Sequence, residues 1–148
     1  MSSDSNTGKF PSCFPKDFVT EILPQDASFE NRVVYRIIKN GIINRDSFLS
    51  SFEEDAKNNI VRKIALDLMN PSTYSTSCFD NKSKARKMLK FFMKRNPAAF
   101  LAKGITAIEC GPSQVTFCRT NDKNDKAHID WWIYDDSKPH VFFEKAED

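Results

Sequence analysis

Hydrophobic and polar residues alternate most clearly between positions 127 and 134, in the segment Ala-His-Ile-Asp-Trp-Trp-Ile-Tyr. Successive side chains of a β-strand point to opposite faces, so this segment divides into an apolar set and a more polar set. The apolar set is Ala127, Ile129, Trp131 and Ile133, and the other set is His128, Asp130, Trp132 and Tyr134. The pattern therefore predicts a strand with one face on a hydrophobic core.

Three further apolar runs lie close to this strand along the chain: residues 105–110, 114–120 and 140–144. Polar segments at 121–126 and 135–139 separate the runs, and their Asn, Asp, Ser and Pro residues are typical of turns. The spacing predicts a meander of about four strands, mostly antiparallel.

The first hundred residues carry apolar residues at helical spacing instead. Ser28 is a candidate cap for a helix over 29–39, which the pair Asn40-Gly41 would end. A second helix is predicted to start at Asn44 or Asp46, with Phe48, Leu49 and Phe52 facing inward, and a third covers 60–69. Residues 72–79 are expected to form a loop or a short strand.

The clearest helical pattern covers Lys82–Arg95, where Ala85, Met88, Leu89 and Phe92 form one apolar stripe after a cap at Asp80 or Asn81. Residues 98–103 are predicted to add a further helical turn before Gly104. Together these patterns predict an α+β fold, with N-terminal helices packed on a mostly antiparallel C-terminal sheet of about four strands. We expect residues 1–9 to be disordered and residues 10–148 to form a single domain.

The composition narrows the class of protein but does not define a function. The chain has 148 residues, 13 of them Phe, and a net charge of +2. It lacks an apolar run of the roughly 18 residues that a membrane helix needs, and its polar N-terminus does not resemble a signal peptide. We therefore expect a soluble cytoplasmic protein that does not contact a membrane. The four cysteines are scattered, which favours buried thiols over disulfides and gives no reason to expect a metal or a cofactor.

The segment 82–95 contains seven Lys or Arg residues and no acid, whereas residues 1–70 carry nine basic and ten acidic residues. A helix with this composition can contact phosphates, although many such helices only present charge to water. The candidate binding residues on it are Lys84, Arg86, Lys87, Lys90 and Lys94.

The polar face of the predicted strand at 127–134 offers a second candidate surface. His128 and Asp130 are neighbours on that face, close enough for a carboxylate to orient an imidazole, with Trp132 and Tyr134 available for stacking. Pairing with the preceding strand would add Arg119 and Thr120. In the alternative interpretation, Trp132 and Tyr134 pack under a helix while His128 and Asp130 form hydrogen bonds within the sheet.

Two short segments, Val34-Tyr-Arg36 and Tyr74-Ser-Thr-Ser77, together resemble ADP-ribosyltransferases. Members of that family often place an Arg after an aromatic residue on an early strand and a Ser-Thr-Ser on a later one. The Glu-x-Glu or Gln-x-Glu pattern that would be expected to follow is missing, and we predict a helix at 29–39. The motifs Gly-Ile-Thr, Gly-Pro and His-Ile-Asp-Trp-Trp also resemble small uncharacterised bacterial proteins, a resemblance that implies no activity.

Two functions follow from these features. The first is a small intracellular binding or accessory module, non-enzymatic, that acts on nucleic acid or on a protein partner in a bacterial or phage defence or toxin–antitoxin setting. The alternative is an enzyme on a nucleotide substrate, similar to ADP-ribosyltransferases, with Arg36, Arg119, His128 and Asp130 as candidate catalytic residues. The sequence leaves the oligomeric state open.

Overall fold

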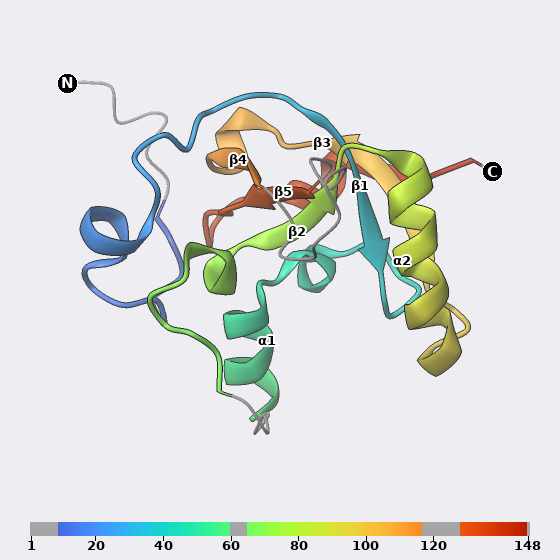
Figure 1. Ribbon diagram of the computed structural model, residues 1–148, viewed down its shortest axis with the longest axis horizontal. Helices are drawn as coiled ribbons and strands as arrows, with labels where there is room; N and C mark the ends of the chain where they lie inside the picture. The colour runs from blue at the N-terminus through green and yellow to red at the C-terminus, as the bar shows by residue number, and fades with distance from the viewer. Residues whose placement is uncertain (1–8, 60–64, 117–127, 148) are drawn as a thin grey trace.

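The computed structural model describes residues 9–59, 65–116 and 128–147. Within these residues the fold is α+β, and six strands form one antiparallel sheet in the order β4-β5-β2-β1-β3-β6 (Figure 1). The strands are β1 (Val33–Ile38), β2 (Thr76–Phe79), β3 (Phe100–Ile105), β4 (Ser113–Thr116), β5 (His128–Trp131) and β6 (Phe143–Lys145). The sheet is larger than the predicted four strands because β1, β2 and most of β3 lie before the predicted meander. The strand predicted at 105–110 was wrong, since Ile105 ends β3 and Ile108–Cys110 form a 3-10 helix.

Strand β1 lies where the sequence predicted a helix, so that prediction was wrong. Its central position in the sheet explains the pattern, because both of its faces are covered. Ile37 packs toward helix α2 (Lys82–Arg95), while Val34 and Ile38 belong to the core on the opposite face. A strand buried on both faces carries consecutive β-branched residues, which a helical stripe can imitate. Gly41 does adopt a left-handed conformation, with φ of 79°, but it turns the chain after a strand.

Strand β3 corrects a second prediction, since residues 98–103 were expected to be helical. It pairs with β1 along its whole length, from Val33 opposite Ile105 to Ile38 opposite Phe100. Gly104 allows the next strand to approach, because a Cβ at this position would overlap the Phe142 carbonyl oxygen and the Phe143 ring. Here the missing side chain is what permits β6 to pair with β3.

Helix α2 forms with the predicted bounds, and the Asn81 side chain accepts a 3.0 Å hydrogen bond from the Lys84 backbone N–H at its start. The helix predicted after Asn44 is divided into a 3-10 helix (Arg45–Phe48) and α1 (Ser51–Asn58). It divides because Ser50 forms a capping box with Glu53 and starts a new helix there. Of the third predicted helix, residues 60–64 lie outside the described residues and residues 65–69 are not helical.

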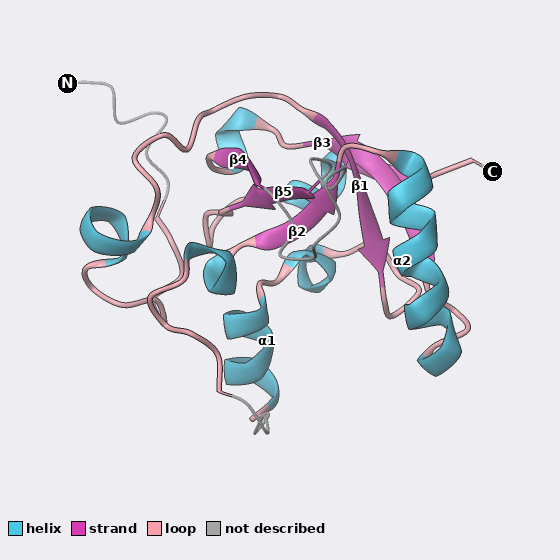
Figure 2. Ribbon diagram, in the orientation of Figure 1, coloured by secondary structure: helices cyan, strands magenta, loops and turns pink. Residues whose placement is uncertain are grey.

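Short helical turns complete the described elements, and they surround the sheet (Figure 2). One turn of π-helix covers Phe18–Ile22, and 3-10 helices cover Pro71–Tyr74, Ile108–Cys110 and Pro139–Phe142. None of the helices in the described part of the chain is long and apolar enough to cross a membrane.

Three apolar clusters hold these layers together. Helix α2 packs Ala85 against Ile37 and Leu101 on one face of the sheet. The main core lies on the opposite face; Trp131 and Ile129 of β5 belong to it, together with Phe48, as their alternation predicted. The third cluster joins the N-terminal segment to residues near β2 and β5; its buried members are Phe14, Phe18, Ile22, Tyr74 and Trp132.

The cysteines that the structure describes are free thiols. Cys78 and Cys110 are buried and Cys13 is exposed, while Cys118 lies outside the described residues. The predicted disordered segment, residues 1–9, lies outside the described residues except for Lys9.

Candidate functional site

Strands β1 and β2 pair at a single position, Tyr35 opposite Phe79. Continuing that register would place Ile37 opposite Ser77, but the strands diverge and the Arg36 side chain occupies the opening. Arg36 Nη1 donates a 2.8 Å hydrogen bond to the Ser77 carbonyl oxygen, and Nε donates a 3.1 Å bond to the Ser47 carbonyl oxygen. The guanidinium thus joins β1, β2 and the 3-10 helix that precedes α1.

A cleft of about 290 Å³ lies at this opening, between α1 and α2. Its polar wall includes Arg36, Ser75, Ser77 and His128, and its apolar wall includes Ile37, Phe79, Met88 and Phe92. A second hollow of about 250 Å³ shares Arg36, Lys39 and Glu54 with the cleft. The ion pair between Lys39 Nζ and Glu54 Oε1, at 3.7 Å, therefore lies on the boundary between the two hollows.

The charge of Arg36 is the main electrostatic feature of the cleft. Arg36 is only 7% exposed, and burial lowers the pKa of its guanidinium. Among the described residues, no carboxylate forms an ion pair with Arg36, and Nη2 has no hydrogen-bond partner. The charge of Glu54, which pairs with Lys39, offsets the lowering of the Arg36 pKa only in part. A buried cation without an ion-pair partner is costly, so a ligand anion in this cleft would be stabilised.

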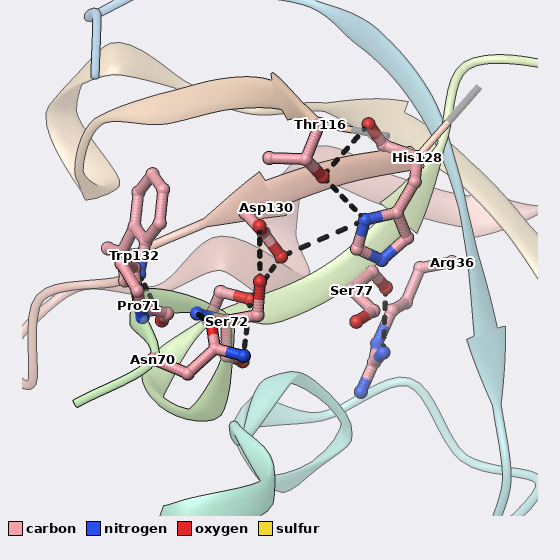
Figure 3. Close-up of polar contacts among 10 residues, drawn as sticks. Arg36, Asn70, Pro71, Ser72, Ser77, Thr116, His128, Asp130 and Trp132 are labelled. Atoms are coloured by element: carbon pink, nitrogen blue, oxygen red, sulfur yellow. Dashed lines mark hydrogen bonds and ion pairs between the residues drawn. The ribbon is translucent and has the colours of Figure 1, made fainter. Parts of the chain in front are cut away.

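The second polar group of the site is His128, at the start of β5. The strand register places His128 between Phe79 of β2 and Thr116 of β4. Its Nδ1 shares a 2.7 Å hydrogen bond with the Thr116 hydroxyl, and the Phe79 ring contacts it edge-on, with centroids 5.9 Å apart. The side chain is 17% exposed and extends toward Ser77 and Arg36 (Figure 3). These contacts fix the ring, and Nε2 is without a hydrogen-bond partner in the described part of the chain.

Asp130 lies beside His128 but is closed off from solvent. It is 1% exposed, with Oδ1 3.8 Å from His128 Nδ1. The Ser75 hydroxyl donates a 2.5 Å hydrogen bond to Oδ1, and the Ser72 hydroxyl donates a 2.8 Å bond to Oδ2. Both carboxylate oxygens are therefore occupied, so Asp130 orients its neighbours and is not placed to accept a proton from a ligand (Figure 3).

Three of the four predicted catalytic candidates lie in this region. Arg36 and His128 line the cleft, and Asp130 supports its wall. The fourth, Arg119, lies outside the described residues, as does the predicted binding residue Thr120. Lys39, Glu54 and the apolar wall were missed, because α1 and α2 bring them together and no local pattern marks them.

Trp132 and Tyr134 are buried, as the alternative interpretation expected, and do not form an exposed stacking surface. Trp132 is fully buried, and its Nε1 donates a 2.9 Å hydrogen bond to the Pro71 carbonyl oxygen. Tyr134 is 5% exposed, with its ring 4.9 Å from that of Phe10. The alternation fails here because β5 ends at Trp131, and the N-terminal segment covers the residues that follow.

The basic residues of α2 lie on a different surface from the cleft. Arg86, Lys87 and Lys90 line an open groove of about 860 Å³ beside the ends of β3 and β6. Arg86 also donates a 3.0 Å hydrogen bond to the Glu147 carbonyl oxygen. Lys84 and Lys94 are not part of the groove wall, and Lys94 Nζ lies 5.5 Å from the centre of the Phe91 ring. The five predicted residues thus belong to one helix but not to one site.

In comparisons with known proteins, no family model matches this chain, and neither a curated protein nor a solved structure matches it significantly. The arrangement of side chains therefore carries the functional argument. Within the described residues, no three His, Cys, Asp or Glu side chains are grouped so that they could hold a metal ion. The cleft combines the buried cation of Arg36, the fixed imidazole of His128 and an apolar wall. Together these groups suit an anionic ligand with a flat ring.

Proposed function

We propose that the cleft binds a nucleotide through a phosphate group and that the protein is an enzyme on a nucleotide substrate, similar to ADP-ribosyltransferases. The observation that carries the proposal is Arg36, a buried guanidinium on the wall of a cleft with no described carboxylate paired to it. Phosphate is the anion that such a planar group recognises best, since it can accept more than one N–H bond.

The arrangement of the two segments that resemble ADP-ribosyltransferases supports this proposal. The resemblance implies that an Arg after an aromatic residue lies on an early strand, and Tyr35-Arg36 lies in β1. It also implies a Ser-Thr-Ser on a later strand, and residues 75–77 lead into β2. The hydrogen bond from Arg36 to the Ser77 carbonyl oxygen joins the two segments directly.

The chain departs from that family's pattern at the third position. Strand β5 pairs with β2 and carries His128-Ile-Asp130 where an acidic pair would be expected, with Asp130 directly opposite Ser77. In our proposal His128 exchanges a proton with the bound substrate, because its side chain reaches the cleft and an imidazole nitrogen can either donate or accept a proton. Asp130 is then a positioning residue that fixes Ser75 and lies beside the imidazole.

The apolar wall supports a nucleotide rather than a simple anion. Phe79 and Phe92 line the cleft together with Met88, and aromatic side chains stack readily on bases. The volume of about 290 Å³ is at the lower end of the sizes found for small-molecule sites, roughly 300–1,000 Å³. The cleft can therefore enclose one nucleoside half of a ligand, with the phosphate at Arg36.

The binding-module interpretation receives less support from this part of the structure. It relied on Trp132 and Tyr134 as exposed aromatics, and both are buried. Its other element, the basic helix, lies on a separate surface.

Isothermal titration calorimetry with ADP, NAD⁺ and inorganic phosphate tests the proposal, with nicotinamide release from NAD⁺ as the activity assay. Arg36→Gln should abolish binding of all three, whereas Arg36→Lys should keep part of the phosphate affinity because it keeps the charge. Arg95→Gln is the matched control, since Arg95 is an exposed residue that does not line the cleft. His128→Asn should retain ADP binding and lose nicotinamide release. Equal affinity of Arg36→Gln and Arg95→Gln for ADP would contradict the proposal.

A further inference from the structure

A basic groove lies on the side of α2 that faces away from the cleft. We define it by its rim, Arg86, Lys87, Lys90 and Lys145, and by the apolar residues of its floor, Leu89, Met93, Phe100, Leu101 and Ala146. Its volume is about 860 Å³, roughly three times that of the cleft. Its walls are formed by three elements: α2, β3 and the end of β6.

All the charged residues that line the groove are basic. None of the residues that line it is acidic, and in the described part of the chain Lys87, Lys90 and Lys145 form no ion pair. The acids nearest to Lys145 in the sequence, Glu144 and Glu147, are not among the residues that line the groove. Three cations, Lys87, Lys90 and Lys145, therefore lie in one groove that has no acidic residue in its lining, which complements a chain of negative charges.

The positions of the cations favour an extended anion over a compact one. Lys87 and Lys90 of the groove wall are three residues apart on α2, which is about one helical turn. Lys145 adds a cation from the opposite wall, where its Nζ lies 5.3 Å from the centre of the Phe100 ring. The cations thus lie on two walls of the groove, Lys87 and Lys90 on α2 and Lys145 at the end of β6, and the groove also has an apolar floor.

The apolar floor distinguishes between kinds of polyanion. Phe100 and Met93 line the groove together with these cations, so a flat base could stack there. A duplex keeps its bases stacked inside and would contact only the rim, and an acidic peptide has no flat rings to place on the floor. We infer that the basic groove binds single-stranded nucleic acid, with phosphates on Lys87, Lys90 and Lys145 and bases against Phe100 and Met93. This inference rests on residues that do not line the cleft, so its test is independent of the test of the proposed nucleotide site.

Fluorescence anisotropy with a short labelled single-stranded oligonucleotide, at low and moderate salt, tests this inference. The double variant Lys87→Glu/Lys90→Glu should weaken binding by about a hundredfold and should lower the salt dependence by about two phosphate contacts. The matched control is Lys16→Glu/Lys138→Glu, which changes the net charge equally at exposed positions outside the groove. It should change the affinity by less than about threefold, since distant charges are screened. Phe100→Leu, which keeps an apolar side chain, should weaken binding by about tenfold through lost stacking.

Four results would overturn the inference. They are absence of binding at low salt, equal loss of affinity in the two double variants, tighter binding of duplex than of single strand, and equal affinity for polyglutamate of similar length. Circular dichroism of each variant verifies folding, which the exposed positions of Lys87 and Lys90 should leave intact.

Discussion

Arg36 Nη1 donates a 2.8 Å hydrogen bond to the Ser77 carbonyl oxygen at the place where β1 and β2 stop pairing. This contact has two consequences. It supplies a donor to a backbone carbonyl that the neighbouring strand does not reach, and it holds a guanidinium at the wall of the cleft. The stability of the sheet and the affinity of the site are therefore linked through one side chain.

Replacing Arg36 should affect both properties. Arg36→Gln should lower the free energy of unfolding by about 1–3 kcal/mol, because the carbonyl oxygens of Ser47 and Ser77 lose their donor. Urea denaturation measures this change, and calorimetry with ADP on the folded variant measures the loss of affinity. An unfolding loss with unchanged ADP affinity would mean that the guanidinium serves only the sheet.

The carboxylate of Asp130 should matter for stability because two hydroxyls depend on it. Asp130→Ala should cost about 2–4 kcal/mol, since the hydroxyls of Ser72 and Ser75 lose their buried acceptor. Asp130→Asn should cost less, because an amide oxygen can still accept one of these bonds. Thermal and urea unfolding of the two variants would show the order, and a larger loss in Asp130→Asn would argue against this account of the network.

Both tryptophans of β5 and its extension should be equally important to the fold. Trp131 and Trp132 are fully buried, in the main core and in the N-terminal cluster respectively. Each substitution by Ala should lower the free energy of unfolding by about 3–5 kcal/mol. Val141→Ala, at a position 62% exposed, is the control and should change it by less than about 0.5 kcal/mol. A small loss for Trp132→Ala alone would mean that the N-terminal segment does not cover it in solution.

Cys78 should make the protein sensitive to high pH. Burial raises the pKa of its thiol from 9.0 to about 12, with Arg36 lowering it and Asp130 raising it to lesser extents. Above pH 9 the unfolded chain loses this proton while the folded chain keeps it, so the contribution to stability falls as pH rises toward 12. The slope from this group is at most about 1.4 kcal/mol per pH unit.

Cys78→Ala removes the titrating group, so its unfolding free energy should fall less steeply between pH 9 and 12 than that of the native protein. Urea unfolding at several pH values makes the comparison. Identical pH profiles for the two proteins would show that Cys78 does not contribute.

Glu54 should oppose anion binding in the cleft. It is the one carboxylate among the described residues that line the cleft, and it holds Lys39 at 3.7 Å. Glu54→Gln removes a negative charge from the wall of the cleft, so the affinity for ADP should rise by about two- to fivefold, in keeping with the small energy of an exposed charge interaction. Asp46→Asn is the control, because Asp46 pairs with Lys57 and does not line this cleft. Weaker ADP binding in Glu54→Gln would mean that the carboxylate itself contacts the ligand.

Local patterns in the sequence correctly predicted the elements that are stabilised by residues close to one another in the chain. Helix α2 needs only its Asn81 cap and its apolar stripe, and both lie within fifteen residues. The alternation of Ile129 and Trp131 likewise placed those side chains in the core. The alternating pattern ceased to predict burial at Trp132, because the segment that covers it begins more than a hundred residues earlier in the chain.

The sequence by itself determined an α+β chain, the position of α2 with its unbalanced positive charge, and the inward face of β5. Only the tertiary structure decided that residues 33–38 form a strand, because an apolar run with β-branched residues satisfies either a helix or a strand buried on both faces. It also decided that Arg36, Ser77 and His128 share one cleft. These residues come from three strands, and their proximity follows from strand pairing over distances in sequence that no local pattern records.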